Sequence, residues 1–214
     1  IGVETVYGLD VGTFRTIDAL TTLAFDYPQR AKFFRSELEN YLLLAREQQF
    51  DLLAIRGSYA GALGIPQFMP SSYRTYAVDF NGDHKVDLLR EAEDAIGSVA
   101  SYLKGYGWIS GKDIAVRAQI GEEACPGDVA PPRTVAAWSA AGVVPGVNAA
   151  QDGSARLIDF TVGEGKEFWL AFNNFDVITR YNNSDYYAMS VVQLAEAIKA
   201  ARQSSDANKS SAAK

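Results

Sequence analysis

The chain has 214 residues, a formal net charge of −6 and an apolar content of 48%. This length and composition suffice for one large domain, or for a core with a small appendage. The acidic balance argues against a nucleic-acid partner or an anionic-membrane surface, because both need basic patches. The single cysteine, Cys125, excludes an internal disulfide, and no apolar run approaches the ~18 residues of a membrane span.

Apolar residues recur with a helical period in four segments, which predicts helices over residues 16–25, 30–48, 91–104 and 187–202. The buried face of the second is predicted to hold Phe34, Leu38, Tyr41, Leu42 and Ala45. The buried face of the third is predicted to hold Ile96, Val99, Ala100 and Leu103. Charged residues of the second helix, Glu37 among them, fall mostly off the apolar stripe and indicate a solvated face.

Between the last two helices the pattern changes to alternating or β-rich apolar runs at 114–120, 155–162 and 167–172, separated by Gly- and Pro-rich turns. This predicts a small β-containing subdomain, with a short helix over 135–141 as an open possibility. The segment 203–214 is rich in Ser, Ala, Asn and Lys without an apolar period, so we expect it to be disordered.

Glu4 lies among apolar neighbours, and Gly8 permits a sharp change of chain direction just after it. A carboxylic acid in a partly desolvated site can protonate the leaving oxygen of a glycosidic bond. Taken alone, a glutamate at such a position is more often a solvated charge. Glycosidases usually pair two carboxylates, but Asp10 lies in a Gly-rich loop and Asp18 better suits the start of the following helix.

Residues 57–72, GSYAGALGIPQFMPSS, mix glycines, aromatic side chains and an amide. Glycines let the backbone approach a ligand closely, and Gln67 offers both a donor and an acceptor, which suits a polysaccharide. The alternative is that Phe68 and Met69 belong to the core and that the glycines only shape the loop.

Oxygen-bearing side chains alternate along the next segment, at Asp79, Asn81 and Asp83. Oxygen ligands at positions 1, 3 and 5, with a backbone carbonyl at position 7, are typical of a calcium loop. The loop departs from the standard EF-hand because glycine stands at position 4 and Arg90 takes the place of the bidentate glutamate. A generic polar turn is therefore the alternative interpretation.

Three stretches, ETVYG, GSYAGALGIPQFMPSS and NFDVITRYNNSDYYAM, together resemble the motifs of the family B lytic murein transglycosylases of bacteria. The resemblance extends from Ile1 to about Arg202. It implies a mainly helical α+β fold, with a lysozyme-like helical core, a small β-containing subdomain and an EF-hand-like loop. The implied organisation is a catalytic core at 1–111 with its calcium loop at 79–94, the β-containing subdomain at 112–171, a return to the core at 172–202 and a disordered tail at 203–214.

The resemblance further implies cleavage of peptidoglycan glycan strands between N-acetylmuramic acid and N-acetylglucosamine, leaving 1,6-anhydromuramyl ends. Glu4 would be the single catalytic residue. The implied substrate contacts are Ser58, Gln67, Tyr181 and Asn182. The implied ligands of a structural Ca²⁺ are Asp79, Asn81, Asp83, the Lys85 carbonyl and Asp94, and no organic cofactor is expected.

Two other functions remain open at this point: a hydrolytic muramidase, and a non-catalytic module that binds peptidoglycan or calcium. For any of them the resemblance implies a monomer in the bacterial periplasm or cell envelope. An export signal or lipid anchor would lie upstream of this chain.

Overall fold

The computed structural model describes residues 1–121, 131–146 and 149–212, and for 207–212 it describes the backbone path only. Cys125 lies outside these residues. The chain divides into two compact units, Ile1–Gly105 and Tyr106–Lys214.

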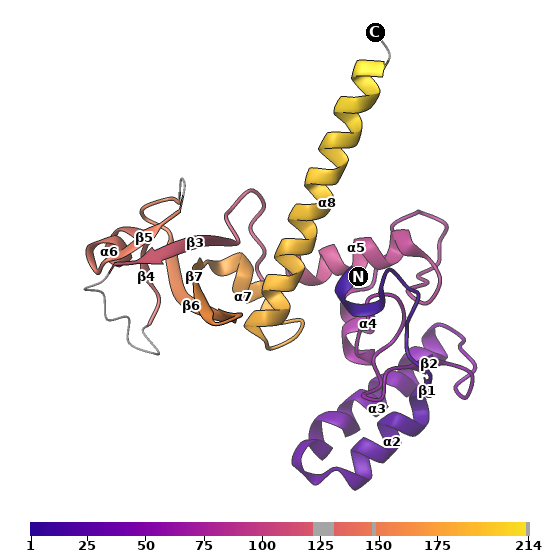
Figure 1. The fold of residues 1–214 in the computed structure, drawn as a ribbon. Coiled ribbons are helices and arrows are strands. Elements are labelled where there is room, and N and C mark those ends of the chain that lie inside the picture. The colour runs from indigo at the N-terminus through magenta and orange to yellow at the C-terminus, as the bar shows by residue number, and fades with distance from the viewer. Residues whose placement is uncertain (122–130, 147–148, 213–214) are drawn as a thin grey trace. The chain divides into compact units, whose positions relative to one another are not determined.

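The first unit is helical. Its helices are α1 (Gly2–Thr5), α2 (Thr16–Asp26), the 3-10 turn η1 (Pro28–Arg30), α3 (Ala31–Glu47), α4 (Pro70–Tyr76) and α5 (Ala92–Gly105). Two short strands, β1 (Phe14–Arg15) and β2 (Arg56–Gly57), pair antiparallel. Pro28 suits the first position of the turn after α2 because its ring fixes φ at a helical value. The N–H that proline lacks would have no partner within a helix at that position. As a result α2 and α3 lie side by side (Figure 1).

The buried side of α3 was predicted in large part, since Phe34, Tyr41 and Ala45 are buried. Leu42 is 46% exposed, so its prediction was wrong. One residue beyond Tyr41 is a turn of about 100°, which carries the side chain off the buried stripe. Glu37 was also misassigned, because it is only 4% exposed.

The buried side of α5 is polar in part, which the apolar pattern did not predict. Ile96 is 56% exposed, whereas Asp94 and Ser98 are fully buried. Asp94 accepts a hydrogen bond from the backbone N–H of Phe80, and Ser98 Oγ accepts one from that of Val78. These two buried side chains of α5 therefore satisfy backbone donors of the loop that precedes the helix.

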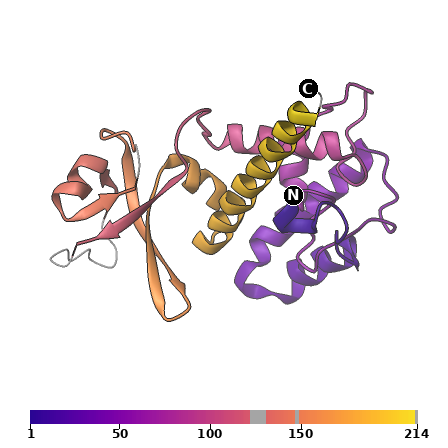
Figure 2. The same cartoon turned by 45° about the horizontal axis from the view of Figure 1, so that its top comes forward.

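The second unit contains a five-stranded sheet with strand order β4-β6-β7-β3-β5, in which all pairs are antiparallel. The strands are β3 (Ala115–Ile120), β4 (Arg133–Thr134), β5 (Val143–Pro145), β6 (Ser154–Val162) and β7 (Gly165–Ala171). Figure 2 shows β6 and β7 as a long hairpin. The two edge strands, β4 and β5, are the shortest strands of this sheet.

Helices cover this sheet at two places, and each place has its own apolar cluster. The helices of the unit are α6 (Val135–Ala140), α7 (Asn173–Thr179) and α8 (Asp185–Ala212). Trp138 of α6 is buried in one cluster and donates its ring N–H to the Ala155 carbonyl at 2.8 Å. Phe175 of α7 and Ala188 of α8 are buried in the other, against Ile158 and Ala171 of the sheet.

The predicted α+β class, with helices predominating, is confirmed. The strands β3, β6 and β7 fall where the sequence predicted them, and α6 lies where the sequence allowed a short helix as an open possibility. The disordered tail was wrong for residues 203–212, because α8 continues to Ala212. Most residues there have only modest helix propensity, but residues added to a helix already begun avoid the cost of nucleation, even without an apolar stripe. Within the described ranges, no helix is both long enough and apolar enough to span a membrane.

Candidate functional site

Glu4 lies on the short helix α1, and its neighbour Thr5 attaches that helix to the loop of residues 57–72, which we call the groove loop. Thr5 is fully buried. Its Oγ1 donates to the Ile65 carbonyl at 2.8 Å and accepts from the Gly8 backbone N–H at 2.9 Å. A buried hydroxyl that satisfies two backbone groups is costly to remove. Glu4 is therefore fixed in position relative to the groove loop.

The chain turns back sharply after Glu4. Val6, Tyr7 and Gly8 all have positive φ, at 49°, 60° and 89°. A positive φ is energetically costly for a β-branched residue such as Val6, so the surrounding structure must impose this backbone conformation. The backbone N–H of Asp10 closes the turn on the Thr5 carbonyl at 3.0 Å. Glu4 itself is partly buried, as proton donation to a bound sugar requires.

Gln67 connects the groove loop to the chain beyond this turn. Its side-chain nitrogen donates to the carbonyls of Val11, at 3.0 Å, and Gly64, at 2.9 Å. The backbone of Gln67 is held at φ 53°. Because both amide hydrogens are used within the protein, a ligand can meet only the side-chain oxygen, which accepts hydrogen bonds.

Ser58 begins the same loop. Its Oγ accepts from the backbone N–H groups of Ala60, at 3.3 Å, and Ala62, at 3.0 Å. The hydroxyl keeps its own hydrogen as a donor. Ser58 and Gln67 therefore offer a sugar complementary groups, one donor and one acceptor.

Gly12 brings residues 1–12, which we call the Glu4 segment, against the start of the groove loop. A Cβ at Gly12 would lie 2.2 Å from the Gly57 carbonyl oxygen, and φ at Gly12 is +92°. Only glycine fits this approach. Glu4 therefore lies on a segment in direct contact with the loop that carries Ser58 and Gln67.

Tyr181 and Asn182 lie in the second unit, in the turn between α7 and α8. The Tyr181 backbone N–H donates to the Ile178 carbonyl at 3.0 Å, and its ring stacks with that of Tyr187 at a centroid distance of 6.5 Å. Asn182 is exposed. Their role in substrate binding stays a prediction.

The proposed calcium loop is closed by hydrogen bonds from its own backbone. Asp79 accepts from the N–H groups of Gly82, at 2.6 Å, and His84, at 2.8 Å. Asn81 Oδ1 accepts from the N–H of Asp83, at 3.0 Å. Asp83 Oδ1 accepts in turn from the Lys85 N–H at 2.9 Å. The predicted ligands are oxygen donors of the kind Ca²⁺ prefers, arranged here as successive polar turns.

Asp94 closes the loop from α5. One of its carboxylate oxygens accepts from the Phe80 N–H at 2.8 Å, and the other accepts from the Asp87 N–H at 2.9 Å. Tyr73 supports the same end of the loop by donating its hydroxyl to the Val86 carbonyl at 3.0 Å. Burial raises the pKa of Tyr73 to about 12, so it stays protonated as a donor.

The donor types of this loop fit Ca²⁺, but their arrangement is not that of a formed metal site. In the part of the chain that the structure describes, no group of three or more His, Cys, Asp or Glu side chains is placed to hold a metal ion. Calcium binding at this loop therefore stays a prediction.

Sequence reasoning missed two residues that shape the site, Thr5 and Glu37. The Glu37 carboxylate accepts from the Ser71 N–H at 2.9 Å and from the Ser71 hydroxyl at 2.7 Å. It thereby caps α4, which follows the groove loop directly. The available signal was the run Pro70-Ser71-Ser72, a helix start that needs an acceptor for its backbone donors.

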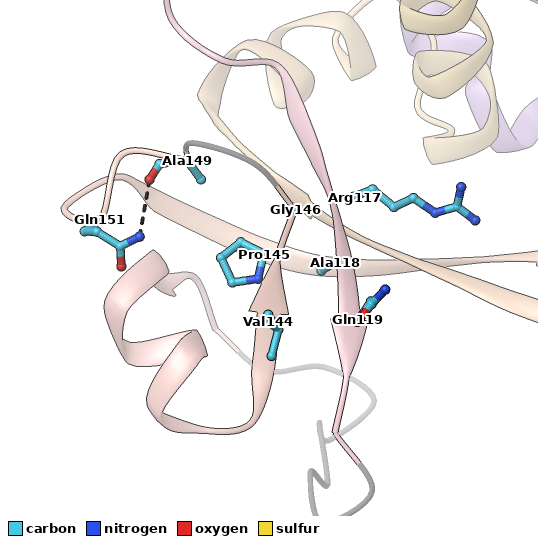
Figure 3. A pocket seen from close by; sticks show the side chains of 8 residues that line it. All are labelled: Arg117, Ala118, Gln119, Val144, Pro145, Gly146, Ala149 and Gln151. Carbon is cyan, nitrogen blue, oxygen red and sulfur yellow. Dashed lines mark hydrogen bonds between the residues drawn. The ribbon is translucent and has the colours of Figure 1, made fainter.

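A hollow of about 550 Å³ lies elsewhere, beside β3 and β5 (Figure 3). Its described lining is Arg117, Ala118, Gln119, Val144, Pro145, Gly146, Ala149 and Gln151. None of these is a carboxylic acid that could protonate a glycosidic bond. The hollow is therefore not a second version of the Glu4 site.

Comparison with known proteins relates this geometry to one class of enzyme. Residues 1–196 match the family described as the transglycosylase SLT domain. The chain is 46% identical over 202 residues to membrane-bound lytic murein transglycosylase B of Escherichia coli strain K12, covering 94% of this chain and 56% of that protein. This chain thus spans little more than half of that relative's length.

Solved structures agree with the family match. Soluble lytic transglycosylase SltB1 from Pseudomonas aeruginosa superposes with a TM-score of 0.87 at 48% identity, covering 94% of this chain and 68% of that one. The Escherichia coli lytic transglycosylase Slt35, in complex with calcium, gives a TM-score of 0.87 at 46% identity, with 94% and 64% covered. The fold is thus that of these lytic transglycosylase structures. This chain belongs to the transglycosylase SLT domain family.

Proposed function

We propose that this chain is the catalytic part of a peptidoglycan lytic transglycosylase with Glu4 as its single catalytic group. The observation that carries the proposal is the attachment of the Glu4 helix to the groove loop through Thr5 and Ile65. Through this contact the segment that carries the partly buried Glu4 meets a loop whose Ser58 and Gln67 offer groups suited to a sugar, which supports the proposal. The family match supports it, and so does a 31% identical relative, SltB3 from Pseudomonas aeruginosa, solved in complex with NAG-anhNAM-pentapeptide.

In the proposed reaction Glu4 first gives its proton to the oxygen that joins N-acetylmuramic acid to N-acetylglucosamine. The bond from the muramyl anomeric carbon to this oxygen breaks, and the N-acetylglucosamine part leaves as an alcohol. The C6 hydroxyl of the same muramyl residue then attacks the anomeric carbon and gives its proton to the Glu4 carboxylate. Glu4 returns to its starting state, and the product is a 1,6-anhydromuramyl end. Since the nucleophile is intramolecular, no second carboxylate is needed to activate water.

The substrate contacts in this proposal are Ser58 and Gln67, together with Tyr181 and Asn182 on the strength of their motif. Peptidoglycan glycan strands are the substrate, and the bacterial envelope is the place of action. The named relative, membrane-bound lytic murein transglycosylase B, supports both assignments.

Mass spectrometry of products from purified murein sacculi tests the proposal. The wild type is expected to release anhydromuropeptides. Glu4→Gln should lower the rate at least 100-fold, which is the usual scale for loss of a general acid. Glu93→Gln, an exposed glutamate of α5, is the matched control and should keep full activity. Products with reducing muramic acid ends would indicate a hydrolytic muramidase. Equal activity in Glu4→Gln and wild type would overturn the assignment of Glu4, and binding to sacculi without any product would favour the non-catalytic module.

The proposal includes a structural Ca²⁺ in the loop 79–94, held by Asp79, Asn81, Asp83, the Lys85 carbonyl and Asp94. The oxygen donors at alternate positions support it, as does the calcium complex of Slt35. A ligand that binds only the folded state raises the melting temperature. We expect millimolar Ca²⁺ to raise it in the wild type but not in Asp83→Ala, and an unchanged wild-type melting temperature would count against the site.

A further inference from the structure

Arg156 of β6 connects the sheet of the second unit to both helices that flank the Tyr181 turn. Its Nε donates to Asp176 Oδ1 of α7 at 2.8 Å. Its two terminal nitrogens donate to both oxygens of Asp185, the first residue of α8, at 2.9 Å and 2.6 Å. A single side chain therefore holds the last helix before the turn and the first residue of the helix after it.

The geometry of these contacts depends on a guanidinium group. Its planar fork of N–H donors can serve two carboxylates at once, one of them in a bidentate pair, whereas a lysine ammonium acts as a point charge. The guanidinium carbon also lies 5.7 Å from the centre of the Phe175 ring, which is fully buried. Only 28% of the Arg156 side chain is exposed. Paired carboxylates and a packed ring together restrict Arg156 to one position.

Short-range hydrogen bonds shape the turn between the two helices. The Ser184 N–H donates to the Asn182 carbonyl at 2.7 Å, and the Tyr187 N–H donates to Ser184 Oγ at 3.2 Å. A polar hollow of about 330 Å³ adjoins it, lined by Arg156, Thr179, Asn183, Ser184 and Asp185. These bonds fix the shape of the turn, and the flanking helices meet the sheet through the apolar cluster of Phe175 and Ala188 and through the Tyr186 hydroxyl, which accepts from the Thr161 N–H of β6 at 3.0 Å. The Arg156 contacts add a charged connection from the sheet to both ends of the turn.

We propose that Arg156 is a positioning residue: it orients the turn of residues 180–184 so that Tyr181 and Asn182 are presented to a glycan strand. This inference rests on the proposed function. It also gives the sheet of the second unit a role in the reaction, as the support for a substrate-binding turn. Asp185 and Asp176 act in the same assembly, with the bidentate Asp185 pair making the larger contribution.

The test compares Arg156→Lys with Arg117→Lys. Arg117 is the matched control, because it lies on β3 of the same sheet and pairs with Glu167 at 2.7 Å, outside the turn. Each variant is measured by its kcat/KM for release of anhydromuropeptides from soluble murein glycan strands. Hydrogen exchange of the amides of residues 180–187 and the melting temperature are measured on the same samples.

We expect Arg156→Lys to lower kcat/KM by about 10- to 100-fold, the scale of a misplaced contact group, and to accelerate exchange in the turn. Arg117→Lys should change neither, and the two variants should melt within a few degrees of each other. The proposal is overturned if Arg156→Lys is as active as wild type. It is also overturned if activity falls without faster exchange in the turn, or if the control shows the same loss.

If Arg156→Lys is too unstable to assay, Asp185→Asn takes its place, because it keeps the shape of the Asp185 side chain and removes its charge. The same two readouts and the same outcomes apply to it. If the wild type releases no anhydromuropeptides, the proposed function itself has failed. Hydrogen exchange then decides alone whether Arg156 fixes the turn, and unchanged exchange would overturn that as well.

Discussion

The Glu4 segment and the Tyr181 turn are held in place by different kinds of interaction. In the first, neutral side chains bond to backbone groups: Thr5 to Ile65, and Gln67 to Val11. In the second, the guanidinium of Arg156 pairs with two carboxylates whose side chains are 46% and 36% exposed. The first set of contacts consists of buried or partly buried neutral hydrogen bonds, and the second adds to apolar packing a set of charges that water can reach.

This difference has physical consequences. A buried neutral hydrogen bond barely responds to salt, but the loss of one partner leaves an unsatisfied group. A partly exposed ion pair is weakened by screening, and its partners are readily solvated when it breaks. The Glu4 segment should therefore be insensitive to ionic strength, while the turn should respond to it.

The largest expected effect comes from Gly12→Ala, which would separate the Glu4 segment from the groove loop. The added Cβ would meet the Gly57 carbonyl oxygen at 2.2 Å, in a backbone conformation with φ +92°. We expect a loss of about 3 to 5 kcal/mol in the free energy of unfolding, from the clash and the backbone strain together.

Gly82→Ala is the control for backbone strain alone, because φ is +80° there and nothing lies within 4 Å of the added Cβ. It should cost about 1 to 2 kcal/mol. Urea denaturation of both variants measures the difference. Equal losses would show that the close approach at Gly12 has little energetic weight.

Thr5→Val should have the next largest effect, since it leaves the Ile65 carbonyl and the Gly8 N–H without their partner. We expect a loss of about 2 to 3 kcal/mol in the free energy of unfolding. The control is Thr21→Val, whose hydroxyl donates to Ile17 and Asp18 of its own helix, and which should lose less than about 0.5 kcal/mol. A Thr5 variant as stable as the Thr21 variant would refute the anchoring role.

Alkaline pH should weaken the first unit through Tyr73. Burial raises the pKa of Tyr73 to about 12 in the folded protein, while an unfolded tyrosine titrates near 10. Its contribution to stability is therefore complete below about pH 10 and is lost as pH rises through about 12. Between these values the wild type should lose about 2 kcal/mol more than Tyr73→Phe, measured by urea denaturation across the range. Parallel curves for the two proteins would contradict this.

Salt should have the smallest effect, confined to the turn. Raising NaCl from 50 mM to 1 M should speed amide exchange in residues 180–187 by an amount equivalent to less than about 1 kcal/mol. Residues 1–12 should be unaffected in the same samples. Similar acceleration in both segments would remove the proposed contrast between the two regions.

Much of the fold follows from local pattern. The helix α3 and the strands β6 and β7 were predicted within a few residues, because their apolar periods are long and regular. The short helix α1 has four residues and no such period. Its conformation depends on the contact of Thr5 with Ile65, sixty positions away, which no local pattern contains.

The candidate site was predicted by motif, but its supporting residues were not. Glu4, Ser58 and Gln67 were named from residue type and family resemblance. Glu37 was assigned to a solvated face because a glutamate usually is solvated, and the acceptor need of the Ser71 backbone became visible only with α3 and α4 packed together. Arg156 was missed because its partners lie 20 and 29 residues further along the chain.

The sheet of the second unit ends on both sides in a very short strand, β4 of two residues and β5 of three. β5 also finishes with Pro145, which has no N–H to offer a neighbour. Long open margins invite further strands from other molecules and so seed fibrils. β4 and β5 themselves offer few backbone groups to a further strand, so association between molecules through these two strands should be weak.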